Sequence, residues 1–121
     1  MARILIVDDS PSQLLGLKRL VEKLGHETLT AEDGAAGVEA TKREKPDLVL
    51  MDVVMPNLNG FQATRAISKD AATSHIPVIL VTTKDQDTDR VWGMRQGAKA
   101  YVTKPVNEAE LTKALSDAMR K

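Results

Sequence analysis

Short apolar runs recur along the chain, and longer amphipathic stretches separate them. Three of the runs are continuous and aliphatic, a pattern typical of strands that helices bury on both faces of a parallel sheet. The second and fifth runs are more polar, as edge strands tend to be. We therefore predict five strands, at Ile4–Val7, Thr28–Ala31, Leu48–Met51, Val78–Val81 and Ala100–Val102.

The stretches between these runs carry the start and stop signals of helices. Ser10 is a good N-cap, Pro11 suits the first helical position, and Gln13 stands where a capping box would be completed. Gly25 then marks a typical helix end. The other helices are expected over Ala35–Glu44, Gly60–Asp70, Asp87–Gln96 and from Asn107 onward.

Strands that alternate with helices predict βαβ units and hence a parallel sheet. We expect an α/β, doubly wound, flavodoxin-like (βα)5 fold with the strand order 2-1-3-4-5, which binds ligands at the carboxyl ends of its strands. With 121 residues and no linker or repeat, residues 1–121 are expected to form a single domain. Asn59-Gly60 favours a hairpin in isolation, but after Pro56 we expect a loop with Gly60 at a special backbone angle.

Composition excludes several kinds of site. The chain has no cysteine, which excludes a disulfide framework and a thiol nucleophile. It has only two histidines, too few to favour a metal site built from histidine. A formal net charge of zero argues against a protein that coats nucleic acid. No apolar run reaches the ~18 residues of a membrane span, and no signal peptide is visible. We therefore expect a cytoplasmic protein with no nucleic-acid or membrane partner.

Acidic side chains follow two strands that the predicted order makes neighbours. Asp8 and Asp9 come directly after the first strand, and Asp52 comes after the third. Like charges gathered at one rim raise one another's pKa values or attract a cation. Carboxylate oxygens without histidine or cysteine suit Mg²⁺, so we favour a magnesium site. The plainer role, in which Asp9 helps to cap the next helix, stays open.

Hydroxyl and ammonium groups follow the other two strands at the same rim. Thr82 ends the fourth strand, and Lys104-Pro105 follows the fifth. Opposite the carboxylates, Thr82 and Lys104 form either an ion-pair network or a site that binds an anion between a metal ion and Lys104. A phosphoryl group transferred to Asp52 is such an anion, because carboxylates can act as nucleophiles in phosphoryl transfer. Composition alone does not favour a cis Lys104-Pro105 bond, since most X-Pro bonds are trans.

Taken together, these motifs resemble the receiver domain of two-component response regulators. The resemblance covers the whole chain and rests on Asp8-Asp9, Asp52 with Met55-Pro56 and Gly60, Thr82, and Lys104-Pro105. It implies that Asp52 accepts a phosphoryl group from a histidine kinase or a phosphotransfer domain. The chain would then be a phosphoacceptor, not an enzyme.

The resemblance also implies roles for the residues around Asp52. Those that it assigns to Mg²⁺ are Asp9, Asp52 and the backbone carbonyl of Val54, with Asp8 acting through water. Thr82 and Lys104 would contact the phosphoryl group. The bond between Lys104 and Pro105 would be a cis peptide.

A further implication of the resemblance is a switch, in which Thr82 turns toward the phosphoryl group and Tyr101 occupies an inward rotamer. The face formed by the fourth helix, the fifth strand and the fifth helix would then bind a protein partner. From the residues alone, Tyr101 could instead pack as an edge-strand aromatic, and Trp92 could lie in the core or on the partner surface. Because Lys121 directly follows the last helix, we expect a monomer without a DNA-binding domain, whose output is a protein contact or a phosphate sink.

Surface segments show a closer likeness to single-domain regulators of chemotaxis-like systems that control type IV pili and twitching motility. The segments are Asn59–Arg65, Val81–Gln86, Val91–Gly93 and Arg95–Ala98. This likeness implies a role in motility control.

Two positions bear on how long a phosphoryl group would last. Val54 and Lys84 follow Asp52 and Thr82 by two residues, where side chains of the family admit and orient the attacking water. Valine cannot hydrogen-bond a water, and lysine is a cation. We therefore expect slow self-dephosphorylation.

Other functions on the same fold fit the sequence less well. A phosphatase with an aspartate nucleophile, similar to the haloacid dehalogenase family, needs a second acid where this chain has Val54. A flavin or nucleotide binder needs a glycine-rich phosphate loop, and Asp8-Asp9-Ser10 stands in its place.

Overall fold

Strands and helices alternate from one end of the computed structural model to the other, which describes residues 2–120. Residues 1 and 121, the ends of the expected domain, lie outside the described residues. The strands are β1 (Arg3–Val7), β2 (Glu27–Ala31), β3 (Leu48–Met51), β4 (Val78–Thr82) and β5 (Ala100–Thr103). The helices are α1 (Pro11–Lys23), α2 (Gly34–Glu44), α3 (Gly60–Lys69), α4 (Asp87–Arg95) and α5 (Glu108–Met119).

The strands form one parallel sheet in the order β2-β1-β3-β4-β5, which confirms the predicted α/β architecture. The register aligns the carboxyl ends of the central strands, because Val7 of β1 pairs with Met51 of β3. The next residues along the chain, Asp8 and Asp52, therefore leave the sheet side by side. Thr82 likewise pairs with Thr103 at the ends of β4 and β5.

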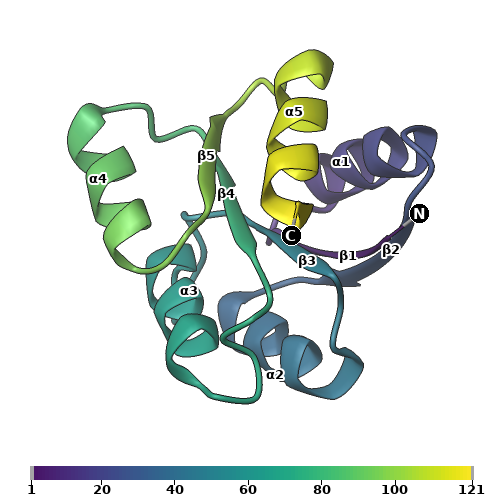
Figure 1. Ribbon diagram of the computed structural model, residues 1–121. Helices are drawn as coiled ribbons and strands as arrows, with labels where there is room; N and C mark the ends of the chain where they lie inside the picture. The colour runs from purple at the N-terminus through teal and green to yellow at the C-terminus, as the bar shows by residue number, and fades with distance from the viewer. Residues whose placement is uncertain (1, 121) are drawn as a thin grey trace.

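Helices cover both faces of the sheet, as Figure 1 shows, with α1 and α5 on one face and α2, α3 and α4 on the other. Alternate residues of each central strand point into the two halves of the core. Ile4, Ile6 and Leu50 pack with the apolar side chains of α1 and α5. Leu5 and Met51 belong to the opposite cluster. This two-sided burial explains why the central strands are continuous apolar runs.

The start of α1 differs from the prediction in one respect. Ser10 is the N-cap and accepts from the backbone amide of Gln13, as expected. The predicted capping box is wrong, however, because the backbone amide of Ser10 donates to Asp8 Oδ1 at 2.9 Å and not to Gln13. A complete capping box occurs instead at α3, between Asn59 and Gln62.

The expectation of a special backbone angle at Gly60 is also wrong. Gly60 is the first residue of α3, and the glycines with positive φ in the described part of the chain are Gly25 and Gly97. Glycine is required at position 60 by close approach, since a Cβ there would lie 2.0 Å from the backbone oxygen of Asp52. The contact fixes the start of α3 against the loop that carries Asp52.

Three large apolar residues are exposed on α4. Val91, Trp92 and Met94 are each about half exposed, which settles the open question about Trp92 in favour of the surface. No helix within residues 2–120 combines the length and the apolar character that crossing a membrane requires.

Candidate functional site

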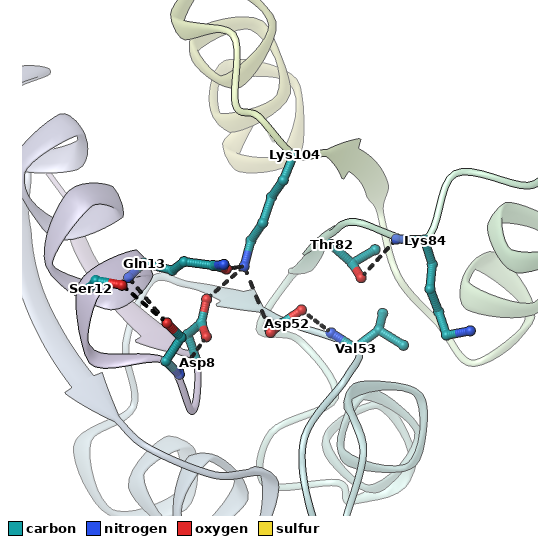
Figure 2. A network of polar contacts seen from close by, with 9 residues as sticks. Asp8, Ser12, Gln13, Asp52, Val53, Thr82, Lys84 and Lys104 are labelled. Atoms are coloured by element: carbon teal, nitrogen blue, oxygen red, sulfur yellow. Dashed lines mark hydrogen bonds and ion pairs between the residues drawn. The ribbon is translucent and has the colours of Figure 1, made fainter.

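The carboxyl ends of four strands meet in a shallow acidic pocket. Figure 2 shows Asp8 after β1, Asp52 after β3, Thr82 at the end of β4 and Lys104 after β5 around this space. Its volume is about 260 Å³. The residues that line it are Asp9, Ser10, Gln13, Asp52, Val54, Thr83 and Lys104.

Three carboxylates converge on this pocket. One oxygen of each of Asp8, Asp9 and Asp52 lies within 4.8 Å of the others. Asp8 is 1% exposed and Asp52 is 8% exposed, whereas Asp9 faces solvent. Carboxylates so close together, with no histidine or cysteine among them, fit a hard, oxygen-binding cation such as Mg²⁺.

Lys104 supplies the positive charge of the site. Its ammonium lies 2.7 Å from Asp8 Oδ2 and 3.7 Å from Asp52 Oδ2, and its side chain is only 12% exposed. It also donates to Gln13 Oε1 (Figure 2). The peptide bond between Lys104 and Pro105 is cis. One ammonium does not neutralise three carboxylates, so the pocket keeps a negative charge.

The environment of Asp52 disfavours its ionised form. Burial is the largest cause and raises the pKa of Asp52 to about 6, with a further contribution from the charge of Asp8. Lys104 and the backbone amides of Val53 and Val54 act in the opposite direction. The Val53 amide donates to Asp52 Oδ1 at 2.8 Å. A carboxylate of raised pKa beside other acids and a cation is typical of a functional group.

Thr82 and Tyr101 are joined through one residue. The backbone amide of Lys84 donates to Thr82 Oγ1 at 3.3 Å, and the carbonyl of Lys84 accepts from the Tyr101 hydroxyl at 2.7 Å. Tyr101 is buried, with the Arg90 guanidinium 5.2 Å from its ring centre. Burial, with Asp89 as the next cause, raises the pKa of Tyr101 to about 12. The phenol is therefore inward and linked to Thr82.

Of the two positions considered for water access, Val54 lines the pocket and Lys84 does not. Val54 is 54% exposed and lines the pocket with Asp52. Lys84 points away from the carboxylates, and its ammonium lies 4.0 Å from Asp89. The side chain of Val54 thus offers no hydrogen bond to a water molecule. The ammonium of Lys84 is near Asp89 of α4 and not near Asp52.

Sequence reasoning missed two residues of this arrangement. Gln13 was assigned to a helix cap, although it lies four residues after Asp9 on the turn of α1 that faces the pocket. Arg90 donates to the carbonyl of Tyr101 and lies over its ring, and nothing in the local sequence distinguishes it from a surface arginine. The usable signal for Gln13 was its place in the first turn of the helix that directly follows Asp8 and Asp9.

Comparisons with known proteins point in one direction. The response regulator receiver domain model matches residues 4–116. Protein PilH of Pseudomonas aeruginosa is 63% identical over 96% of this chain and 96% of its own length. Response regulator PleD of Caulobacter vibrioides is 38% identical over 91% of this chain, which spans 24% of PleD.

A solved structure agrees with this result. The receiver domain of the sensor histidine kinase PA1611 of Pseudomonas aeruginosa matches with a TM-score of 0.89 and 30% identity, over 98% of this chain and 97% of that one. That structure has a magnesium ion coordinated in its active-site cleft. Since the family model covers almost all of the fold and the acidic pocket lies at the expected strand ends, this chain belongs to the family of response regulator receiver domains.

Proposed function

We propose that Asp52 is the phosphoacceptor of this receiver domain. The observation that carries the proposal is the position of its carboxylate, buried between two further acids and an ammonium at one rim of the sheet. Asp8 Oδ1 is occupied by the Ser10 amide and Asp8 Oδ2 by Lys104, whereas Asp9 is exposed. Asp52 is the acid that combines burial, a raised pKa and access to the pocket.

The proposed reaction is transfer of a phosphoryl group from a phosphohistidine of a kinase or phosphotransfer domain. An Asp52 carboxylate oxygen forms a bond to phosphorus as the bond from phosphorus to the histidine nitrogen breaks, and the electron pair stays on the imidazole. Asp9, Asp52 and the carbonyl of Val54 would hold Mg²⁺ directly, and Asp8 would act through a water molecule. When bound, the ion supplies positive charge to the phosphoryl oxygens and screens the carboxylates from one another.

Lys104 and Thr82 would stabilise the phosphorylated state. The Lys104 ammonium already lies 3.7 Å from Asp52 Oδ2, so a short movement brings it to a phosphoryl oxygen. Thr82 Oγ1 now accepts from the Lys84 amide. To donate to the phosphoryl group, its hydroxyl would have to rotate toward Asp52, and the loop after β4 would follow. This movement is the link from phosphorylation to conformation.

The output surface that this movement would reach is the face of α4, β5 and α5. Tyr101 of β5 and Lys84 of the moving loop are hydrogen-bonded to one another, which supports the coupling. Val91, Trp92 and Met94 expose apolar area on α4 beside them. We propose that this face binds a protein partner with an affinity that depends on phosphorylation, since a ligand shifts a conformation only by binding its states unequally.

The resemblance to PilH supports a role in the control of type IV pili and twitching motility. The chain covers 96% of PilH at 63% identity, a likeness that extends beyond the motifs shared by receiver domains in general. A phosphate sink, which drains phosphoryl groups from a shared kinase, is the second candidate. The non-hydrogen-bonding Val54 beside Asp52 favours the switch over the sink, because a sink works better with rapid hydrolysis.

The direct test is phosphorylation by a small donor. Wild-type protein and Asp52→Asn are incubated with acetyl phosphate, with and without Mg²⁺, and intact masses are measured. We expect one added phosphoryl group in the wild type with Mg²⁺ and none in the variant. An equal gain in Asp52→Asn would remove Asp52 from its assigned role. Unmodified wild-type protein in the presence of Mg²⁺ would contradict the proposed function itself.

A further inference from the structure

The side chain of Gln13 makes a contact that its place in the helix does not require. It occupies the third position of α1, where glutamine commonly bonds back to the N-cap amide. That amide, of Ser10, is already bonded to Asp8 Oδ1 at 2.9 Å. Gln13 instead turns into the pocket and accepts a hydrogen bond from Lys104 through Oε1 (Figure 2).

Gln13 completes the set of acceptors around the Lys104 ammonium. Lysine carries three N–H donors and no acceptor. Two of the donors have close partners on the side of β1 and α1, which are Asp8 Oδ2 at 2.7 Å and Gln13 Oε1. Asp52 Oδ2 lies farther away, at 3.7 Å. The pair of close contacts leaves the remaining N–H facing Asp52 and the open pocket.

We propose that Gln13 is a positioning residue for phosphoryl transfer, which holds the Lys104 ammonium over Asp52 without neutralising it. The inference rests on the proposed function of Asp52. An amide oxygen fixes an ammonium in place but leaves its full positive charge for an incoming anion, whereas a carboxylate would cancel that charge. Gln13 and Lys104 line the same pocket as Asp52, where a phosphoryl group would arrive.

Loss of the Gln13 oxygen would change which groups contact the Lys104 ammonium. The ammonium would be left with two carboxylates, at 2.7 and 3.7 Å, and would move toward a closer ion pair with Asp52. An ion-paired carboxylate is a weaker nucleophile, and the ammonium would have to be pulled away before it could bind a phosphoryl oxygen. Phosphorylation should therefore slow although the fold is intact, because Gln13 itself is exposed.

The test compares Gln13→Met, which keeps the length of the side chain and removes the oxygen, with the matched control Gln62→Met. Gln62 is also exposed and is the third residue of α3, where it makes a capping contact away from Lys104. The first measurement is the ¹H–¹⁵N NMR spectrum of the lysine ammonium groups in metal-free protein, with Lys104→Ala to assign the signal. The second is the rate of phosphorylation by acetyl phosphate at saturating Mg²⁺.

We expect the Lys104 signal to broaden or shift in Gln13→Met alone. The phosphorylation rate of that variant should fall about 3- to 10-fold, because the lost contact of the exposed Gln13 is worth no more than one ordinary hydrogen bond. Gln62→Met should match the wild type in both measurements. An unchanged Lys104 signal or an unchanged rate in Gln13→Met overturns the inference. If wild-type protein takes no phosphoryl group, the proposed function fails, and the NMR comparison alone still decides whether Gln13 positions Lys104.

Discussion

The hydroxyl of Tyr101 donates a 2.7 Å hydrogen bond to the backbone carbonyl of Lys84, whose own amide donates to Thr82. Lys84, in the loop after β4, therefore bonds both to the Thr82 hydroxyl at the end of β4 and to the phenol of Tyr101, whose ring contacts Arg90 of α4. Any movement of Thr82 must change or break a contact of Lys84. The site and the surface of α4 are thus connected through a single short segment.

Removing the phenol hydroxyl tests this connection. We predict that Tyr101→Phe lowers the free energy of unfolding by about 1 kcal/mol, because one partly buried hydrogen bond is lost. Since the pKa of Tyr101 is raised to about 12, the hydroxyl is a donor throughout the neutral range, and the effect should not vary between pH 6 and 9. Urea unfolding monitored by Trp92 fluorescence measures it. A variant as stable as the wild type would show that the Lys84 contact contributes nothing.

The raised pKa of Asp52 predicts that ionised Asp52 destabilises the metal-free folded protein, by an amount that depends on pH. Burial raises this pKa to about 6 from 3.8. The folded state therefore binds the proton more tightly than the unfolded state, and the contribution of Asp52 to stability declines as pH rises from about 4 to 6. Above pH 6 the cost in stability is complete. The full shift would correspond to about 3 kcal/mol, and because Asp52 lies at the edge of an open pocket, where solvent screens its charge, Asp52→Asn should be more stable than the wild type by about 1–2 kcal/mol.

Urea unfolding in EDTA between pH 4 and 8 measures that difference. The advantage of Asp52→Asn should be close to zero at pH 4, grow up to about pH 6 and then stay level. Added Mg²⁺ should stabilise the wild type and reduce the gap, because the ion binds the folded carboxylates. A difference that is constant with pH would mean that Asp52 has an ordinary pKa in the folded state.

Close packing at Gly60 predicts a steric effect on the site. A Cβ at residue 60 would lie 2.0 Å from the backbone oxygen of Asp52, so Gly60→Ala should cost about 2–4 kcal/mol and displace the loop that carries Asp52. Gly16 is the matched control, because a Cβ there meets nothing within 4 Å. As alanine is the better helix former, Gly16→Ala should stabilise the protein by about 0.5–1 kcal/mol. Thermal unfolding of both variants decides whether the contact at Gly60 is tight.

The apolar side chain at position 54, on the open side of the pocket, predicts a long-lived phosphoryl group. Val54 lines the pocket but cannot orient a water, so we expect loss of the phosphoryl group over minutes, not seconds. Val54→Asn should shorten the lifetime by adding a hydrogen-bonding group at the pocket. Val91→Asn is the control, because Val91 of α4 is equally exposed, at 53% against 54%. Decay of the phosphorylated mass after removal of acetyl phosphate measures the lifetime, and equal decay in both variants would argue against this role of Val54.

The sheet and most of the site were predictable because they depend on short-range patterns. The apolar runs end where the strands end to within one or two residues, since both record burial by helices on two faces. Asp8, Asp9 and Asp52 could be placed together from strand order alone, because parallel strands end at a common rim. The sequence pattern therefore predicted the order of the strands and the types of residue at their carboxyl ends.

Contacts that depend on competition between side chains were not predictable. Gln13 has the right position for a capping box, but Asp8 takes the Ser10 amide and leaves Gln13 free for Lys104. Gly60 is explained by the tertiary approach of the Asp52 loop, not by its own backbone angle. In each case the deciding partner is distant in sequence or is one of several local candidates, and only the packed structure selects between them.

The measurement that tests the central claim most directly is identification of the phosphorylated residue. Borohydride reduces an aspartyl phosphate to homoserine, so protein treated with acetyl phosphate and Mg²⁺, then reduced and digested, carries a permanent mark at the acceptor. The account predicts homoserine at position 52 and at no other aspartate, with none in protein that was not exposed to acetyl phosphate. Homoserine at position 8 or 9, or none at all in protein whose mass shows a phosphoryl group, would contradict it.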